Sequence, residues 1–272
     1  MTLALVMISA LMHAVWNAML RTEPDKDRGL VGAVTVATLL AMIVAGVRWG
    51  LGEAPFASAM AVGWAIAAGL LEWVYFVTLA RALDRGPLGT VYTVSRGGAI
   101  VVIYPISIAF LHEHVSTFAI AGSAVVLAGV VLTGMPKAAH RSAVAWAVVC
   151  AAAIAGYHLA YKLALEAGGS SSAVFAVALS VATGLNAARI RGVAAVVRAR
   201  TGRIVLMGLI CGGSFLILIQ ALTTGGAGFV LTARNMSVLF ATVIAAAIGE
   251  RPSRAQVSGA VLVAGGALLM AW

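Results

Sequence analysis

Apolar segments long enough to cross a lipid bilayer recur along almost the whole chain of 272 residues. A membrane-spanning α-helix needs about 20 predominantly apolar residues, because each residue adds only about 1.5 Å along the helix axis. Ten segments meet this description, and they cover residues 2–20, 30–47, 60–82, 88–111, 117–134, 143–165, 171–188, 204–222, 227–248 and 256–272. We therefore expect an all-α integral membrane protein with ten transmembrane helices and almost no extramembrane domain.

The composition also excludes a water-soluble domain. Hydrophobic residues make up 62% of the chain and charged residues 10%, whereas soluble chains carry about 25% charged residues. The net charge of +9 could indicate a nucleic-acid partner. However, the basic residues of membrane proteins collect in cytoplasmic loops, where they set the orientation of the chain. We therefore attribute the positive charge to the orientation of the chain in the lipid bilayer and expect no nucleic-acid partner.

The sequence carries no motif for a metal, a cofactor or a catalytic nucleophile. Cys150 and Cys211 lie inside apolar segments, so neither a disulfide framework nor a Cys-x-x-Cys metal site is indicated. His112-Glu113-His114 lacks the histidine pair at i and i+4 that a zinc-binding helix needs. Neither a G-x-S-x-G motif nor a phosphate-binding loop occurs, so we expect no cofactor and no enzymatic activity.

Polar motifs in and beside the apolar segments occur twice, once in each half of the chain. Three pairs match in order and type: His13-x-x-Trp16-Asn17 with His158-x-x-Tyr161-Lys162, Arg96 with Arg234, and Glu113-x-x-Ser116 with Glu250-x-x-Ser253. Their offsets are 145, 138 and 137 residues. Such near-constant offsets predict two copies of one unit, residues 1–136 and residues 137–272.

Each copy contains five expected helices, which is an odd number. The second copy must therefore enter the bilayer from the face opposite to the first, so the two five-helix repeats are inverted. A duplicated membrane unit with matched polar residues is the usual layout of a secondary transporter. In such proteins the two copies rock around a site near the bilayer midplane, which opens to each side in turn.

Basic residues in the loops predict which way the chain lies in the membrane. Fourteen of them fall in the odd-numbered loops: Arg21, Lys26, Arg28, Arg81, Arg85, Lys137, Arg141, Arg189, Arg191, Arg198, Arg200, Arg203, Arg251 and Arg254. The even-numbered loops and both termini hold only Arg48 and Lys162. The positive-inside rule therefore places the odd-numbered loops in the cytoplasm and both termini outside.

Residues 82–132 resemble the end of an EamA domain of the drug/metabolite transporter superfamily. The resemblance rests on an Ala-Leu-rich turn, a helix through Pro105, the Glu113-x-x-Ser116 motif and a Gly-rich last helix. Residues 225–272 resemble it again, although Pro105 has no counterpart there. Over essentially the whole chain, the resemblance implies a ten-helix carrier of amino acids, sugars, amines or other small metabolites. Solved relatives are generally described with cytoplasmic termini, which conflicts with the charge count that we follow here.

Arg96 and Arg234 are the first candidates for a substrate site. Arg96 lies eight residues into its apolar segment, about 12 Å along a helix, and is therefore too deep to reach water easily from the near end. Arg234 is placed similarly in the ninth segment. Two guanidiniums facing one cavity would favour a carboxylate or phosphonate, because their planar fork binds such groups at two points. Alternatively, each arginine caps helix carbonyls or pairs with a carboxylate and only stabilises the bundle.

Glu72 is the only carboxylate well inside an expected helix, and its counterpart in the second copy is about Cys211. We interpret it as the proton-coupling residue, since a carboxyl group in a low dielectric holds a proton more readily than one in water. Two alternatives stay open. Glu72 could bind an amine of the substrate, or it could only neutralise Arg96 or Arg81.

The first expected helix of each copy carries a polar and aromatic face with spacings of i, i+3 and i+4. These faces consist of His13, Trp16 and Asn17 in the first copy and of His158, Tyr161 and Lys162 in the second. We expect them to line a cavity together with Tyr92, and a histidine there could also carry a proton. Lys162 has less weight because it lies near a helix end. Hydrogen bonding between helices is the alternative role.

Glycines spaced seven residues apart occur on the last expected helix of each copy: Gly122 with Gly129, and Gly259 with Gly266. Because faces of small residues let helices approach closely, we expect these glycines to serve packing and not chemistry. Glu113 and Glu250 precede the expected start of the same two helices. We interpret both glutamates as structural.

Taken together, these patterns predict a proton- or gradient-driven carrier of a small polar metabolite, anionic or zwitterionic, in the bacterial inner membrane. Arg96, Arg234, Glu72 and the two histidine faces would surround one central cavity. The rival function is a lipid flippase or a membrane-embedded enzyme that acts on lipid head groups. Such an enzyme would need a nucleophile or metal cluster at one interface, and the sequence shows none. A homodimer is kept as a candidate assembly.

Overall fold

The computed structural model describes residues 2–111, 116–134, 141–224 and 233–270 of the chain. These parts contain α-helices and no strand. The helices are α1 (Thr2–Arg21), α2 (Lys26–Gly50), α3 (Ala59–Arg85), α4 (Leu88–Leu111), α5 (Thr117–Gly134), α6 (Arg141–Glu166), α7 (Ser171–Arg189), α8 (Val193–Ala199), α9 (Thr201–Thr224), α11 (Ser237–Ala247) and α12 (Arg254–Met270). The His112-Glu113-His114 motif lies outside the described residues.

Six of the described helices, α1, α2, α3, α6, α7 and α9, are long and apolar enough to cross a membrane. Four shorter apolar stretches fall in α4, α5, α11 and α12. Each of these ten stretches overlaps one of the ten segments expected from the sequence, because the same apolar runs that suit a bilayer also favour continuous helix. The chain is therefore an all-helical protein with six candidate membrane spans in its described part.

Side chains and glycines set the ends of several helices. Ser58 accepts a hydrogen bond from the backbone N–H of Ala61 and begins α3, and Ser170 accepts one from Ala173 and begins α7. Each serine satisfies an N–H group that the first turn of a helix leaves without a partner. Gly168 and Gly249 adopt positive φ angles of 90° in the connections after α6 and α11, where a side chain would be strained.

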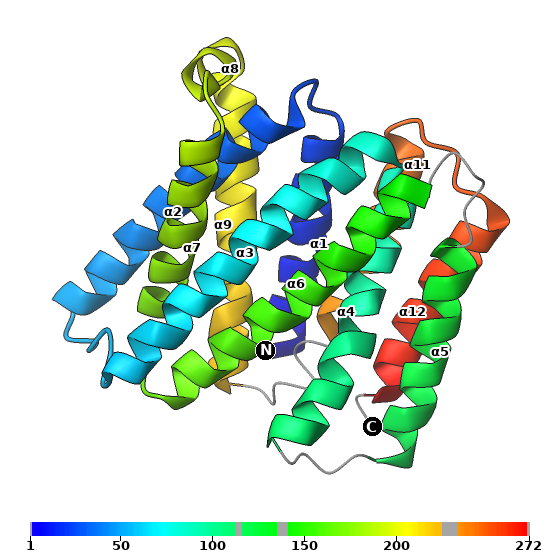
Figure 1. Ribbon diagram of the computed structural model, residues 1–272, viewed down its shortest axis with the longest axis horizontal. Coiled ribbons are helices and arrows are strands. Elements are labelled where there is room, and N and C mark those ends of the chain that lie inside the picture. The colour runs from blue at the N-terminus through cyan, green and yellow to red at the C-terminus, as the bar shows by residue number, and fades with distance from the viewer. Residues whose placement is uncertain (1, 112–115, 135–140, 225–232, 271–272) are drawn as a thin grey trace.

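The two halves of the chain pack against each other in reciprocal pairs of helices (Figure 1). The contact of α3 with α6 is matched by that of α1 with α9. Likewise, the contact of α4 with α6 is matched by that of α1 with α11, and α5 packs on α12. The core is therefore built mostly between the halves and not within each of them.

The α5–α12 pair depends on the four repeated glycines. A Cβ atom added at Gly129 would lie 2.6 Å from the Gly259 carbonyl oxygen, and one added at Gly259 would lie 2.6 Å from the Gly129 oxygen. Gly122 and Gly266 face each other in the same reciprocal way, at 2.6 and 2.7 Å. The glycines thus let the two backbones approach more closely than any side chain would allow.

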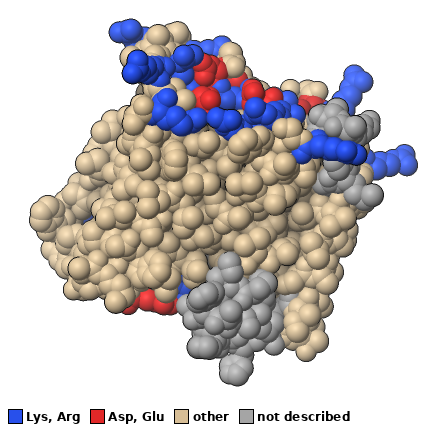
Figure 2. Space-filling model, in the orientation of Figure 1, with Lys and Arg blue, Asp and Glu red and all other residues tan. Residues whose placement is uncertain are grey.

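Lys and Arg side chains gather along one end of the molecule (Figure 2). This end carries the α1–α2, α3–α4 and α11–α12 connections together with α8, whereas α1 begins and α12 ends at the opposite end (Figure 1). We call it the basic face. The charge count predicted basic loops on one side of the membrane, and the fold has this arrangement.

Two features depart from the expected helices. The connection between α7 and α9 contains the seven-residue helix α8, which sits on the basic face (Figure 1). In addition, a turn at Asn235 and Met236 separates α11 from the helical residues Ala233 and Arg234. The single helix expected over residues 227–248 is therefore interrupted, and Arg234 lies at the interruption and not inside α11.

Candidate functional site

Residues that the sequence analysis selected lie on five different elements. His13, Trp16 and Asn17 come from α1, Glu72 from α3, Tyr92 and Arg96 from α4, His158 and Tyr161 from α6, and Arg234 from the segment before α11. All nine side chains are buried. Lys162, the remaining member of the repeated motif, is half-buried and lies 4.0 Å from Glu166 at the end of α6.

His13 connects α1 to the interrupted segment. Its Nδ1 atom lies 3.1 Å from Nε1 of Trp16 and 3.0 Å from Nη2 of Arg234. Its ring also makes edge contacts with Tyr92, at a centroid distance of 6.1 Å, and with Phe215 of α9, at 5.4 Å. Asn17 donates a hydrogen bond of 2.7 Å to the His13 carbonyl oxygen. Thus a residue from the first repeat motif directly contacts the arginine from the second half.

Arg96 and Arg234 line the same pocket. The other residues of this pocket are Ala99, Ile100, Ile103, Ile154, Ala155, His158 and Asn235. The Arg234 guanidinium lies 4.7 Å from the centre of the Phe215 ring, and the Arg96 guanidinium lies 6.0 Å from that of Tyr92. The pocket volume is about 40 Å³, which is room for a few water molecules and not for a metabolite.

His158, the counterpart of His13, is held differently. Its Nδ1 atom lies 2.7 Å from the carbonyl oxygen of Ile154 in its own helix. Since a carbonyl oxygen only accepts hydrogen bonds, this Nδ1 carries the proton. The imidazole stacks on Tyr157 with ring centres 4.3 Å apart. The two equivalent histidines therefore present different nitrogen atoms to their neighbours.

Glu72 is fully buried, and neither of its carboxylate oxygens has a hydrogen-bond partner among the described residues. It forms no ion pair with Arg96 or Arg81 in the described part of the chain. Instead, the Arg81 guanidinium lies 5.2 Å from the ring centre of Trp146. The described residues therefore show no contact that supports neutralisation of Arg96 or Arg81 by Glu72.

Many buried polar atoms in this region have no hydrogen-bond partner among the described residues. They are His13 Nε2, Asn17 Oδ1, Glu72 Oε1 and Oε2, Tyr92 Oη, Arg96 Nη2, Tyr157 Oη, His158 Nε2, Tyr161 Oη, Arg234 Nε and Nη1, and Ser237 Oγ. A buried polar atom without a partner is costly and rare in a folded protein. Their concentration here therefore points to a site that exchanges ligands, water or protons.

Sequence reasoning missed the rings that join these residues. Tyr157 stacks on His158 and contacts Tyr75 at 5.5 Å and Tyr161 at 5.8 Å. Phe215 contacts both the His13 ring and the Arg234 guanidinium. Two signals were present in the sequence, because Tyr157 precedes His158 directly and Tyr75 follows Glu72 by one helical turn. Nothing in the sequence singled out Phe215.

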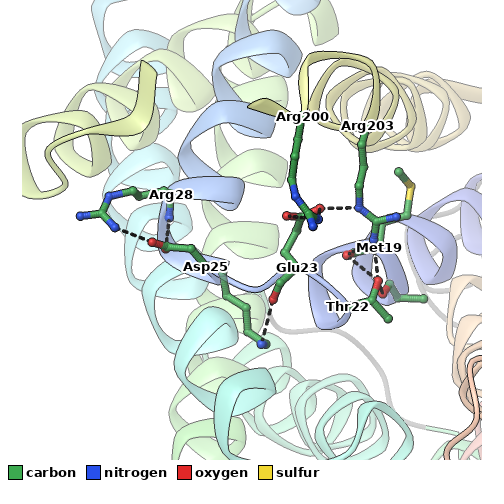
Figure 3. Close-up of polar contacts among 9 residues, drawn as sticks. Met19, Thr22, Glu23, Asp25, Arg28, Arg200 and Arg203 are labelled. Carbon is green, nitrogen blue, oxygen red and sulfur yellow. Dashed lines mark hydrogen bonds and ion pairs between the residues drawn. The ribbon is translucent and has the colours of Figure 1, made fainter. Parts of the chain in front are cut away.

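The basic face is closed by ion pairs between the two halves of the chain (Figure 3). Glu23, in the α1–α2 connection, is buried and accepts hydrogen bonds from Arg203 Nε and, at 3.2 Å, from Arg200 Nη1. Arg203 also donates to the Met19 carbonyl oxygen at 2.9 Å, so it caps the end of α1. We call this group the Glu23 clasp.

Glu250 adds a second connection at the same face. Its carboxylate accepts hydrogen bonds of 3.0 Å from Arg21 at the end of α1 and from the backbone N–H of Leu88 at the start of α4. It therefore joins the α11–α12 connection to two helices of the first half. The structural role predicted for Glu250 agrees with these contacts, whereas Glu113 lies outside the described residues.

Backbone contacts link the two halves at the opposite end of the molecule. Ala57, just before α3, donates to the Gly168 carbonyl oxygen at 2.9 Å, and Ser170 donates to Pro55 at 2.8 Å. Ser58 Oγ donates to the Ala167 oxygen at 2.7 Å. The α6–α7 connection thus contacts the start of α3, as the α1–α2 connection contacts the start of α9.

A bundle of long apolar helices around a buried polar centre defines a multi-pass membrane protein. Residues 141–272 match the EamA-like transporter family. The resemblance noted in the sequence is therefore confirmed over residues 141–272. A solved crystal structure of a protein superposes with a TM-score of 0.68 and 16% sequence identity, over 98% of this chain and 95% of that chain. No curated protein matches the sequence.

Proposed function

We propose that this protein is a secondary transporter that moves a small anionic or zwitterionic metabolite across the bacterial inner membrane by alternating access. The observation that carries the proposal is the shared pocket of Arg96 and Arg234. Inserting an arginine near the middle of a membrane helix costs at least about 2.5–3.5 kcal/mol. Two such residues at matched positions on one pocket are explained by a ligand that repays this cost.

Charge and geometry favour an anionic group at this pocket. Among the described residues, Arg96 Nη2 and the Nε and Nη1 atoms of Arg234 have no hydrogen-bond partner. The buried Ser237 hydroxyl at the start of α11 likewise has no partner in the described part of the chain. Helix N-termini attract anions, and interrupted helices supply them near the midplane of transporters. A carboxylate or phosphonate would satisfy these donors together.

Glu72 distinguishes a zwitterion from a simple anion. Its two oxygens make no hydrogen bond of ordinary geometry among the described residues, and Tyr161 is a neighbouring side chain that could donate to them. A substrate ammonium group would satisfy them, and so would a proton taken up from the medium. Within the proposed transporter we assign the proton to Glu72, so that the charge of this carboxylate changes during the cycle.

Alternating access requires two halves that move against each other. We propose that residues 1–136 and 137–272 are inverted five-helix repeats, which gives ten spans in all. The reciprocal helix pairs support this arrangement, because the contact of α3 with α6 matches that of α1 with α9, and the contact of α2 with α9 matches that of α3 with α7. The contacts of the α1–α2 and α6–α7 connections, at opposite ends of the molecule, support it in the same way.

The pocket of about 40 Å³ implies that the structure represents a state between openings. The Glu23 clasp (Figure 3) would have to separate for the pocket to open at the basic face, and so would the Glu250 contacts. The α6–α7 contacts with Ala57 and Ser58 would have to separate for it to open at the other end. Opening of one set while the other stays closed is the proposed cycle.

The rival proposal is a lipid flippase or an enzyme acting on lipid head groups. Both alternatives need an acyl chain to follow the head group, so the site would have to open sideways into the bilayer. A soluble metabolite needs openings to water alone. The lipid bilayer is in each case a partner, and a homodimer in the bilayer is part of neither mechanism.

A binding screen tests the proposal. Purified protein is heated with single metabolites, and the unfolding temperature is recorded for anions, zwitterions, cations, sugars and short-chain phospholipids. We expect stabilisation by one or more water-soluble anions or zwitterions, since a ligand at 100 times its Kd stabilises by about 2.7 kcal/mol. Arg96→Ala should abolish the shift, whereas Arg198→Ala on α8 should keep it. Stabilisation by phospholipids alone would favour the rival.

A further inference from the structure

His13 and Arg234 meet through atoms whose chemistry fixes the protonation of the imidazole. The guanidinium of arginine and the indole N–H of tryptophan can only donate hydrogen bonds. Both Arg234 Nη2, at 3.0 Å, and Trp16 Nε1, at 3.1 Å, approach the same Nδ1 atom of His13. This nitrogen must therefore act as an acceptor and carry no proton. The neutral ring then bears its proton on Nε2, which has no partner among the described residues.

We propose that a proton on Nδ1 of His13 and the contact with Arg234 exclude each other, so that proton uptake by His13 releases Arg234. A proton on Nδ1 would point toward the donors Arg234 Nη2 and Trp16 Nε1. The hydrogens on these three nitrogen atoms would then have no acceptor. The imidazolium would also place a positive charge beside the Arg234 guanidinium. Either effect separates the two side chains.

The surroundings of His13 add to this exclusion. Tyr92 and Arg96 face it from α4, His158 from α6, and Arg234 from the segment before α11. The nearest contribution of α9 is the uncharged ring of Phe215. No described carboxylate lies within ion-pair distance of His13. A charge on His13 would be the third positive charge beside those of Arg96 and Arg234, and the repulsion is relieved most directly when Arg234 moves away.

Arg234 is not held inside α11. A turn at Asn235 and Met236 separates it from that helix. Its Nε and Nη1 atoms make no hydrogen bond among the described residues. The contact with His13 is thus the only described side-chain hydrogen bond that holds this guanidinium.

His158 does not form an equivalent switch. Its Nδ1 already carries a proton and donates to Ile154, so the vacant nitrogen is Nε2. Proton uptake at Nε2 breaks no hydrogen bond of this residue. The two histidines occupy matched positions in the sequence, yet only His13 links proton uptake to an arginine. His158 therefore serves as the matched control.

The consequence of this switch for transport rests on the proposed function. An anion that binds Arg234 would draw it from His13 and free Nδ1 to accept a proton. By linkage, a proton on His13 would in turn make Arg234 available to the anion. Proton and anion would then bind together and cross together, with His13 as the residue that positions Arg234.

A labelling experiment tests the switch without any substrate. Ser237 is buried three residues after Arg234, and Ser237→Cys places a thiol at the segment that Arg234 would carry along. The full-length protein in lipid nanodiscs is treated with a maleimide between pH 8 and pH 5. The background labelling rate of the protein without the added cysteine is first subtracted. The labelling rate of Ser237→Cys is then divided by that of the double variant Ser237→Cys with His13→Asn at the same pH. Asparagine keeps an acceptor near Nδ1 and cannot take up a proton.

We expect this ratio to rise by about ten- to a hundredfold as the pH falls, the change that loss of one hydrogen bond to a charged group produces in an opening equilibrium. Ser237→Cys with His158→Asn should show the same rise as Ser237→Cys alone. A ratio that stays constant with pH would overturn the switch, and so would a rise that requires His158.

A fluorescence titration provides the second measurement in case a variant does not fold. The contribution of Trp16 to the fluorescence is the difference in emission between the unmodified protein and Trp16→Phe. A charged imidazole beside an indole quenches the indole emission. We expect the Trp16 contribution to fall on acidification and a pH-independent contribution to overturn the proposal. Neither readout uses a substrate, so failure of the switch and failure of the transport function are distinguishable.

Discussion

The hydroxyl oxygens of Thr38 and Thr183 lie 2.7 Å apart at the contact between α2 and α7. Each hydroxyl also approaches a carbonyl oxygen of the other helix, Thr38 that of Leu179 at 3.4 Å and Thr183 that of Val34 at 3.5 Å. Thr38 and Thr183 are separated by 145 residues, and so are Val34 and Leu179, which is the offset of the His13 and His158 motifs. The axis of the proposed inverted repeat therefore passes between these threonines.

Replacing either threonine with valine should remove the same interaction. We expect Thr38→Val and Thr183→Val to destabilise the protein by less together than the sum of their separate effects. The coupling should be on the order of 0.6 kcal/mol, the usual size for side-chain hydrogen bonds between membrane helices. Reversible unfolding of the four proteins in detergent measures it. Thr35→Val, which loses only a bond to Val31 in its own helix, is the control and should show no coupling with Thr183→Val.

Neighbouring glycines of α12 should respond very differently to alanine. A Cβ atom at Gly266 would lie 2.7 Å from the Gly122 carbonyl oxygen, whereas one at Gly265 would meet nothing within 4 Å. We expect Gly266→Ala to cost about 1–3 kcal/mol through overpacking. Gly265→Ala should be neutral or slightly stabilising, because alanine favours helix. Thermal unfolding of both variants checks this, and equal effects would mean that α5 and α12 are farther apart than described.

The orientation in the membrane can be read with a reporter that is active only in the cytoplasm. The basic face carries most loop arginines, and α12 ends at the other side (Figures 1 and 2). We therefore expect a reporter fused after the last residue to be silent and one inserted near Arg198 to be active. The opposite pair of results would show that the termini are cytoplasmic, as in solved relatives of the resembled family.

Glu72→Gln tests the proton-coupling assignment. Glutamine keeps the shape and an acceptor oxygen but cannot take up a proton. We expect accumulation of substrate driven by a pH gradient to be lost, while exchange of labelled for unlabelled substrate continues. Glu166→Gln, at an exposed carboxylate of α6, should retain both activities. Loss of both activities in Glu72→Gln, with normal folding, would assign the residue to substrate binding or structure instead.

The helices and the polar centre could be predicted from the sequence because both depend on local patterns. Apolar runs fixed the extent of most helices, and the isolated arginines and Glu72 stood out within them. The arrangement of the motifs in two copies was equally visible, because it needs only residue types and spacing. These features do not depend on which helix packs on which.

Other features depend on packing and were therefore not predictable. The hydrogen bond between His13 and Arg234 joins residues 221 positions apart, and no local pattern announces it. The turn before α11 interrupts an apolar run that hydropathy treats as one helix. Phe215 belongs to the site only through packing, because its ring reaches His13 and the Arg234 guanidinium from α9.

The central claim is that Arg96 and Arg234 bind the transported molecule, and transport in reconstituted vesicles tests it most directly. The substrate is the best-stabilising metabolite from the binding screen. Arg96→Ala and Arg234→Ala should each weaken substrate affinity by about ten- to over a hundredfold, because each removes a charge-assisted hydrogen bond in a dry site.

Arg96→Lys and Arg234→Lys should restore only part of the activity, since lysine keeps the charge and loses the planar fork. Arg198→Ala is the matched control on α8 and should transport at the parental rate. Every variant must keep its size-exclusion profile and unfolding temperature. If both alanine variants fold normally and transport at the parental rate, the two arginines are not in the substrate path and the proposed site is contradicted.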